Sequence, residues 1–184
     1  MTNTKDQLAS SLKQMLAVKP IERITIRDIV EICGVNRQTF YYHFEDVYDL
    51  LEYVFESDAE KYLPKVVVYD NWKDDVVYYF RYLYANKDFA ISLFHSQSRD
   101  YLLKYYYDKL RVCVESFAKL VSVDMVIDKG DFDFVIEFYT NCVVGIISQW
   151  IASGMAVPEW LTTDRCLAVL DNSVENMLER FDRS

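Results

Sequence analysis

Glycine and proline are scarce in this sequence, which has four glycines and three prolines among 184 residues. A protein built from β-strands needs turn residues at short intervals, so this supply is too small for an all-β fold. The spacing of the glycines permits neither G-x-G-x-x-G nor G-x-x-x-x-G-K, which excludes both of these phosphate-binding loops. The composition therefore favours a helical protein.

Histidine and cysteine are also few. His43 and His95 are the only histidines, which excludes metal sites built from several histidines. The cysteines at 33, 113, 142 and 166 form no C-x-x-C pair, so we interpret them as buried thiols rather than zinc ligands or a disulfide framework. A Cys/His catalytic pair stays open, but no carboxylate pair, triad or metal cluster is visible. We expect no catalytic residue, no metal site and no cofactor, and therefore a protein that is not an enzyme.

Long hydrophobic runs are missing as well. The longest uninterrupted apolar stretch, Cys142 to Ile147, is far too short to span a bilayer. The sequence shows no N-terminal signal peptide. We therefore expect a cytoplasmic protein with no membrane partner.

The net charge of −9 at first argues against a nucleic-acid partner. However, residues 1–44 hold six Lys or Arg and four Asp or Glu, a balance of +2 that leaves −11 for the other 140 residues. A DNA-binding head on an acidic body fits this asymmetry, because phosphates would repel the body and only the head could approach them. A chance fluctuation of charge is the alternative that so small an excess leaves open.

The first 44 residues predict a helix-turn-helix. Residues 3–18 carry one apolar stripe at helical spacing, and Pro20 ends that helix. Thr25 is a suitable N-cap for a second helix, and Gly34 follows where a left-handed turn residue is needed. Asn36 then caps a short third helix, 37–42, with Phe40 on its buried side. Two short helices joined by a tight glycine-containing turn make the motif.

The remaining sequence also predicts helices, at about 46–63, 70–85, 87–96, 98–122, 131–153 and 163–181. Asp131 and Asp164 stand where N-caps belong, and Pro64 closes the fourth helix. The run at 66–69 is the one β-like stretch and is too short for a sheet. We predict an all-α fold of about nine helices. Residues 1–47 would form the helix-turn-helix DNA-binding domain, with a connecting helix to about 64, and residues 65–184 a regulatory and dimerisation domain.

The third predicted helix would enter the major groove N-terminus first. Arginine can bond guanine O6 and N7, and glutamine adenine N6 and N7, while Thr, Tyr and His side chains can hold phosphates. The N-terminal amides of the second helix would form an anion site for the phosphates of the DNA backbone. The candidate DNA-binding residues are Thr25, Arg27, Arg37, Gln38, Thr39, Tyr41, Tyr42 and His43. The alternative is a plain helical hairpin with aromatic core residues. However, Tyr41, Tyr42 and His43 follow one another on a helix, so they cannot all be buried.

Residues 22–51, ERITIRDIVEICGVNRQTFYYHFEDVYDLL, resemble the TetR family of transcriptional regulators. The match lies in Gly34-Val35 and in the block from Thr39 to Phe44. The resemblance implies backbone contacts from Thr25 and Arg27, base contacts from Arg37 and Gln38, and phosphate contacts from Thr39, Tyr41, Tyr42 and His43. One departure stands out. The family commonly has lysine where this sequence has Val47, after Glu45 and Asp46, so we expect weaker DNA binding or help from another protein.

Residues 138–161, FYTNCVVGIISQWIASGMAVPEWL, resemble a subgroup of TetR-like regulators that includes the dihydroxyacetone kinase activator DhaS. That activator works with a ligand-binding coactivator protein. The resemblance covers about 25 residues and implies no particular effector.

The family resemblance implies a homodimer in which the last two large helices pair across a two-fold axis. An apolar stripe suits this interface, although an intramolecular core stripe is the alternative: Leu167, Leu170, Val174, Met177, Leu178 and Phe181. The sequence has 15 tyrosines and 11 phenylalanines, and several of them crowd two of the predicted helices: Tyr78, Tyr79, Phe80, Tyr82 and Tyr84 in 70–85, and Tyr101, Tyr105, Tyr106 and Tyr107 in 98–122. These helices would either line a pocket for a small-molecule effector or fill a core with their hydroxyls in water.

We expect a regulator that binds a double-stranded DNA operator, with repression as the family default. An activator that works with a coactivator protein is the second hypothesis. An interaction protein whose head no longer binds DNA is the third, because Glu45, Asp46 and Val47 weaken the head.

Overall fold

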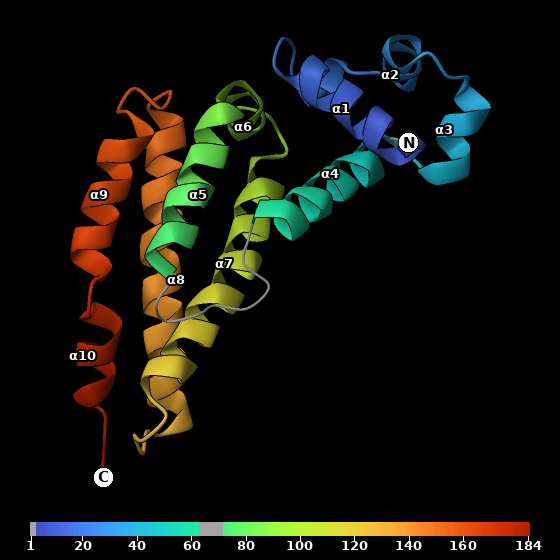
Figure 1. Ribbon diagram of the computed structural model, residues 1–184. Helices are drawn as coiled ribbons and strands as arrows, with labels where there is room; N and C mark the ends of the chain where they lie inside the picture. Colours follow the sequence, from blue (N-terminus) through green and yellow to red (C-terminus); the bar gives the residue numbers. More distant parts are fainter. Residues whose placement is uncertain (1–2, 63–71) are drawn as a thin grey trace.

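A computed structural model describes residues 3–62 and 72–184, and these ranges contain helices and no strand (Figure 1). The all-α prediction is confirmed. The helices are α1 (Thr4–Leu16), the short 3-10 helix η1 (Ile21–Arg23), α2 (Ile26–Cys33), α3 (Arg37–His43), α4 (Val47–Tyr62), α5 (Trp72–Ala85), α6 (Lys87–Phe94), α7 (Arg99–Val121), α8 (Lys129–Ala152), α9 (Glu159–Leu170) and α10 (Ser173–Glu179). Pro64 and the run at 66–69 lie outside the described residues.

Helices α1 to α3 form a head around a small apolar core, which the first turns of α4 complete. Leu8 and Leu12 of α1, Ile29 of α2, Phe40 of α3 and Leu50 of α4 are all fully buried in it. Gly34 ends α2 with φ of 73°, in the left-handed region that glycine adopts without strain. The local signals in the sequence thus placed the helix-turn-helix correctly.

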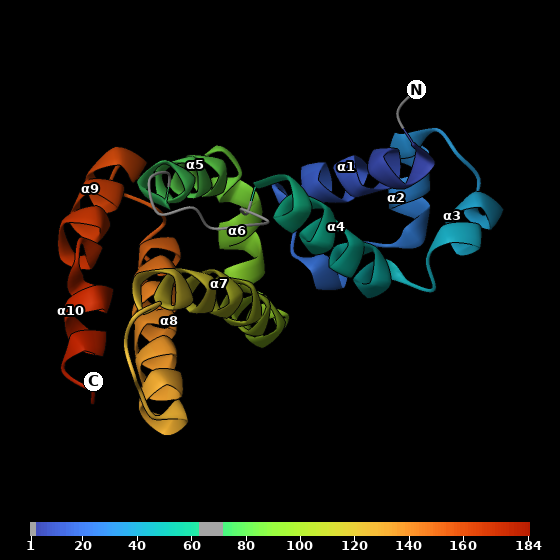
Figure 2. The ribbon, with the colours of Figure 1, turned by 60° about the horizontal axis from the view of Figure 1, so that its bottom comes forward.

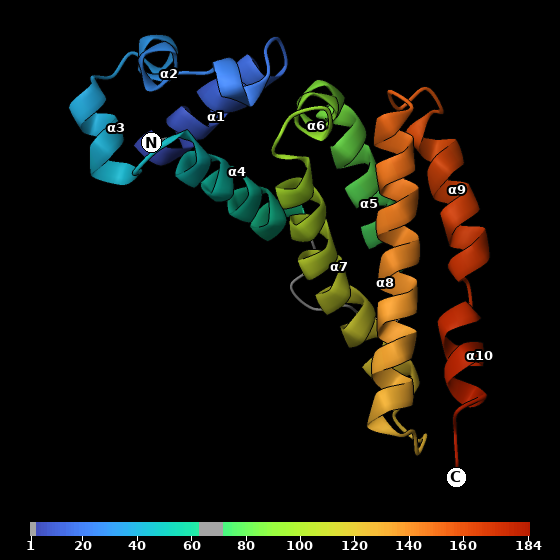
Figure 3. The same ribbon diagram turned by 180° about the vertical axis from the view of Figure 1, so that it is seen from behind.

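Helices α5 to α10 form the body, which α4 joins to the head. Helix α5 packs on α9, α7 packs on α8, and α6 contacts both α1 and α8. The head projects from the side of the body away from α9 and α10, and α3 is the head helix farthest from these two (Figures 2 and 3). The helix-turn-helix is therefore free to approach a large partner without the body in the way.

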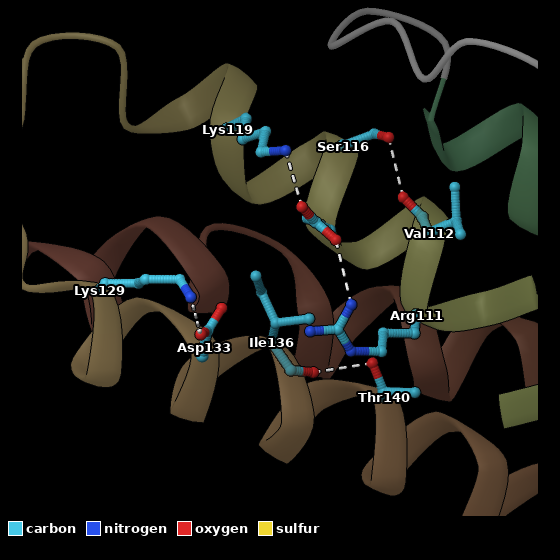
Figure 4. A network of polar contacts seen from close by, with 9 residues as sticks. Arg111, Val112, Ser116, Lys119, Lys129, Asp133, Ile136 and Thr140 are labelled. Atoms are coloured by element: carbon cyan, nitrogen blue, oxygen red, sulfur yellow. Dashed lines mark hydrogen bonds and ion pairs between the residues drawn. The ribbon is translucent and has the colours of Figure 1, made fainter. Parts of the chain in front are cut away.

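The lower part of the body has a second apolar core between α7, α8 and α10, built around Ala118, Ile136 and Leu178. Figure 4 shows the polar rim beside it, where Arg111 and Lys119 both reach Glu115, at 3.2 and 2.7 Å. The predicted dimer stripe belongs largely to this core. Val174 and Leu178 are buried in it, and Leu170, Met177 and Phe181 pack against it. The interface interpretation was wrong for Val174 and Leu178, because helical spacing identifies an apolar face but not what covers it. For Leu167, Leu170, Met177 and Phe181, which are only partly buried, it stays a prediction.

The end of the chain differs from the sequence prediction in three places. One expected helix over 163–181 is two, α9 and α10, because Asn172 adopts a left-handed φ of 55° between them. Helix α9 begins directly after Pro158, so Asp164 lies inside the helix rather than at its cap. Helix α8 is capped by Asp128, whose carboxylate accepts from the Gly130 amide at 2.8 Å, and not by Asp131. Several nearby aspartates gave equivalent cap signals.

Helix α8 is, within the described residues, the one helix long and apolar enough to cross a membrane, on length and composition alone. In this fold it instead runs through the body, with one side on α7 and α10. Val135, Ile136 and Ile147 are buried there, and Phe134, Phe138 and Ile146 are exposed. The apolar composition of α8 thus reflects two apolar sides, one covered by this chain and one open.

Candidate DNA-binding interface

The N-terminus of α2 is fixed by a reciprocal cap. The Thr25 hydroxyl oxygen accepts from the Asp28 amide at 3.3 Å, and the Asp28 carboxylate accepts from the Thr25 amide at 3.0 Å. Lys19 also bonds Asp28, at 2.9 Å. The Lys19 bond, followed by those from Thr25, lowers the pKa of Asp28 from 3.8 to about 2. Because the Thr25 oxygen only accepts in this cap, its hydroxyl proton stays available for a phosphate oxygen.

Helix α3 begins with a second side-chain cap. The Asn36 carboxamide oxygen accepts from the Thr39 amide at 2.8 Å and from the Thr39 hydroxyl at 3.0 Å. Arg37 and Gln38 form the first turn and are exposed, whereas Phe40 is fully buried. The cap therefore fixes the end of the helix that carries the two candidate base-reading side chains. Thr39 would have to exchange its bond to Asn36 in order to donate to a phosphate.

Exposed aromatic rings occupy the second turn of α3. Tyr42 is 84% exposed and Tyr41 54%, and both hydroxyls point to no partner among the described residues. His43 is half-buried, and its ring meets that of Tyr42 edge-on at 4.9 Å. Two adjacent exposed tyrosines supply donors at the ends of rigid rings, which suits contact with a sugar-phosphate backbone.

The structure places all eight candidate residues outside the core, on α3 and at the start of α2, two helices that pack together. In the described part of the chain neither Arg27 nor Arg37 forms an ion pair, so both guanidinium groups are open to an anionic partner. Contact of these residues with DNA stays a prediction, and their exposure and their position on two packed helices are consistent with it.

The acids at the start of α4 have a structural role. The Asp46 carboxylate accepts from the amides of Tyr48 at 2.8 Å and Asp49 at 2.9 Å, which caps α4. The Asp49 carboxylate accepts from the Glu45 amide at 2.8 Å. Val47 is half-buried and packs against the apolar core. Asp46 and Asp49 therefore stabilise the turn between α3 and α4, while Val47, which stands where the family commonly has lysine, packs inward.

The head is joined to the body by a polar contact that the sequence did not reveal. Lys13 of α1 lies 2.9 Å from the Asp58 carboxylate of α4, and the Tyr82 hydroxyl of α5 donates to the same carboxylate. Burial, and then the Asp58 charge, raise the pKa of Tyr82 far above its usual value, so this hydroxyl stays a donor. Lys13 appeared only as a polar residue off the apolar stripe, and no local signal links it to a partner 45 residues away.

A cavity of about 120 Å³ lies inside the body, bordered by α5, α7, α8, α9 and α10. Tyr79 and Phe80 of α5 line the cavity, as the hypothesis of an aromatic pocket predicts for this helix. The tyrosines of α7 are not among the described residues that line it. Tyr105 and Tyr106 instead border a much smaller space beside Asp58. Burial, and then the charge of Asp75, raise the pKa of Cys113 in the cavity wall to about 11.

The outer side of α8 and α9 is apolar and uncovered. Phe134 is 60% exposed, Phe138 46% and Val169 70%. Gly145 lies beside a surface hollow of about 800 Å³, and apart from its chain neighbours and the nearby backbone of α8 no atom of the described residues lies within 4 Å of where its Cβ would be. Exposed apolar side chains that gather on one face are typical of a protein interaction site.

The fold has close counterparts among known proteins. The HTH-type dhaKLM operon transcriptional activator DhaS of Lactococcus lactis subsp. lactis (strain IL1403) is 28% identical over 91 residues, 50% of this chain. That alignment spans 49% of the relative, so the chain matches about half its length. A solved structure of the dihydroxyacetone kinase operon activator DhaS superposes with a TM-score of 0.73 at 20% identity, covering 97% of this chain and 98% of that one. A tetR-family transcriptional regulator from Streptomyces coelicolor gives 0.61 at 15% identity, covering 96% and 90%.

Two family models account for most of the chain. Residues 10–54 match bacterial regulatory proteins of the tetR family, and residues 70–172 match a transcriptional regulator C-terminal region. The first range contains the helix-turn-helix with its two capped helices, and the second contains the described lining of the cavity except Val174, and most of the open face. The chain belongs to the TetR family of transcriptional regulators.

Proposed function

We propose that this TetR-family regulator acts as a homodimer that binds a double-stranded DNA operator and represses transcription by occupying a promoter. The observation that carries the proposal is the first turn of α3, where a side-chain cap fixes Arg37 and Gln38 in exposed positions, with no hydrogen bond or ion pair from their side chains to any residue that the structure describes. These are the side chains that bond guanine and adenine edges in the major groove. Thr25, Arg27 and the aromatic turn of α3 would hold the flanking phosphates.

The open face of α8 and α9 is the proposed dimer interface. Its exposed phenylalanines and Val169 would leave water when a second copy packs against them. Gly145 lies in the interior of α8, where glycine costs roughly 1 kcal/mol of stability relative to alanine, and the space over it would let a partner helix come close. A two-fold dimer of this kind presents two α3 helices, so the operator would be an inverted repeat with half-sites about 34–36 Å apart.

The body is proposed to be regulatory rather than enzymatic. Its internal cavity is a candidate effector site, and its contact to the head through Asp58 is a route by which an effector would act on DNA binding. A protein that works on chromosomal operators would reside in the cytoplasm.

Activation with a coactivator protein is the second candidate function. The partial similarity to a relative described as an operon transcriptional activator favours it. A reporter fused to the selected promoter separates the two functions: deletion of the regulator raises expression if it represses and lowers expression if it activates.

Selection of binding sites from random DNA tests the DNA-binding proposal. We expect enrichment of an inverted repeat. Arg37→Ala should lose about 1–3 kcal/mol of discrimination at one base pair, while Tyr41→Phe should weaken binding to all sequences about equally. Arg81→Ala, which removes an exposed arginine from the body, is the control and should leave binding unchanged. No enriched sequence and no salt-dependent binding would mean that the head serves protein interaction instead.

A further inference from the structure

We propose that the internal cavity of the body binds a small aromatic amine in its cationic form, with the Asp75 carboxylate as the counter-charge. The inference rests on the proposed function, in which this cavity is the effector site, and it names the class of effector. The cavity lies between α5, α7, α8, α9 and α10, and Asp75 is in the first turn of α5.

The size of the cavity limits the ligand. Its volume of about 120 Å³ is close to that of engineered protein cavities of roughly 150 Å³ that accept benzene. A single aromatic ring with a short substituent fits this space, whereas a fused polycyclic compound does not. The walls suit such a ring because they are almost entirely side chains of aromatic and aliphatic residues.

The walls also suit a positive charge. Trp72, Tyr79, Phe117 and Tyr139 all border the cavity, and the faces of aromatic rings attract cations most strongly where water is excluded. Trp72 and Phe117 lie with their ring centres 5.3 Å apart. These rings make the cavity favourable for an organic cation and unfavourable for an anion.

Asp75 supplies the specific contact. It borders the cavity, is half-buried, and has no hydrogen bond or ion pair to any residue that the structure describes. No Lys, Arg or His is among the described residues that line the cavity. The cation nearest in sequence, Lys73, is engaged by Asp171 at 2.7 Å. A half-buried carboxylate at the border of an apolar cavity is the counter-charge that the ammonium group of a bound ligand would meet.

The electrostatic state of Asp75 agrees with this geometry. Loss of solvent, and then the neighbouring charge of Asp74, raise the pKa of Asp75 above its ordinary value. A bound ammonium group would relieve both effects. A neutral ligand of the same shape would leave the carboxylate as it is, so charge should decide which ligand binds.

Calorimetric titration of the full chain with three probes of one shape tests the proposal: benzylamine, benzyl alcohol and benzoate. We expect benzylamine to bind at least tenfold more tightly than benzyl alcohol, and benzoate not to bind. Asp75→Asn should remove most of this preference by weakening benzylamine at least tenfold and changing benzyl alcohol less than twofold. Asp74→Asn, on the exposed side of the same turn, is the matched control and should change neither more than about twofold.

Each other outcome overturns the inference. Equal affinity for amine and alcohol would mean that the carboxylate takes no part, and so would an unchanged benzylamine affinity in Asp75→Asn. Absence of binding by every probe would mean that the cavity is not a site for this class of ligand. Because these titrations contain no DNA, operator binding by the same preparations tests the proposed function separately.

Discussion

The contact between Lys13 and Asp58 should contribute measurably to stability, because it joins α1 to α4 in a largely buried position. The Lys13 ammonium lies 2.9 Å from the nearer Asp58 oxygen, and the two side chains are only 23% and 17% exposed. Asp58→Asn keeps the shape and removes the charge. Lys13→Met keeps the length of the stem and removes the ammonium.

The magnitude follows from the geometry. At 2.9 Å and an effective dielectric constant of about 20, the attraction is roughly 6 kcal/mol, and desolvation of both groups offsets most of it. Hydrogen bonds to charged groups are worth about 1.5–3 kcal/mol net. We therefore expect a coupling free energy of about 1–3 kcal/mol. Each single variant should lower the melting temperature by roughly 2–4 °C per kcal/mol lost, given the length of the chain.

A double-mutant cycle in urea unfolding measures the coupling directly. Lys104 and Asp108, both on α7 and 2.6 Å apart but 74% and 54% exposed, provide the control pair. The control cycle should give no more than about 0.5 kcal/mol, because solvent screens an exposed pair. A coupling for Lys13 and Asp58 as small as the control would refute the reasoning. It would mean that packing, rather than this ion pair, holds α1 against α4.

Three further predictions concern the cap, the interface and the turn before α4. The pKa of Asp28 is lowered to about 2 in the folded chain, so the stability that its carboxylate contributes to the folded state is complete above about pH 4 and is lost as the pH falls through 2. Asp28→Asn should therefore flatten the dependence of unfolding stability on pH in that window, as measured by circular dichroism. Phe138→Glu together with Val169→Glu should give a folded monomer by light scattering, and a persistent dimer would place the interface elsewhere. Val47→Lys should tighten specific and non-specific DNA binding alike and steepen the salt slope by about 0.9, at a small loss of stability; an unchanged slope would show that position 47 does not reach the duplex.

The head was predictable from the sequence because its signals are local. The side chains of Thr25 and Asn36 cap their helices by accepting from backbone amides only three residues later in the sequence. Gly34 adopts the left-handed conformation that separates α2 from α3. Each of these choices depends on the chemistry of a few neighbouring residues. The candidate DNA-binding residues follow from the same signals, since the cap fixes which side chains begin α3.

The body was less predictable because its arrangement depends on distant contacts. Helical spacing found the apolar face that carries Val174, but not that α7 and α8 of the same chain cover it. The break between α9 and α10 falls at Asn172, which adopts a left-handed conformation. The sequence has no glycine at this position, so the break was not predicted. The pairing of Lys13 with Asp58, and the position of Asp75 without a hydrogen bond or ion pair to any described residue, are properties of the packed fold. They appear only when the helices are assembled.

The apolar core does not stop at the boundary between head and body. One cluster runs from Leu8 in α1 through Phe55 in α4 to Trp150 in α8, and α6 contacts the head and the body at once. Tyr79 borders the proposed effector cavity and also the small space beside Asp58, and Asp58 is the residue that pairs with Lys13 of the head. A ligand that shifted Tyr79 in the proposed effector cavity would therefore act on the contact between α4 and α1. By thermodynamic reciprocity, operator DNA must then change the affinity for that ligand by the same factor as the ligand changes the affinity for the operator.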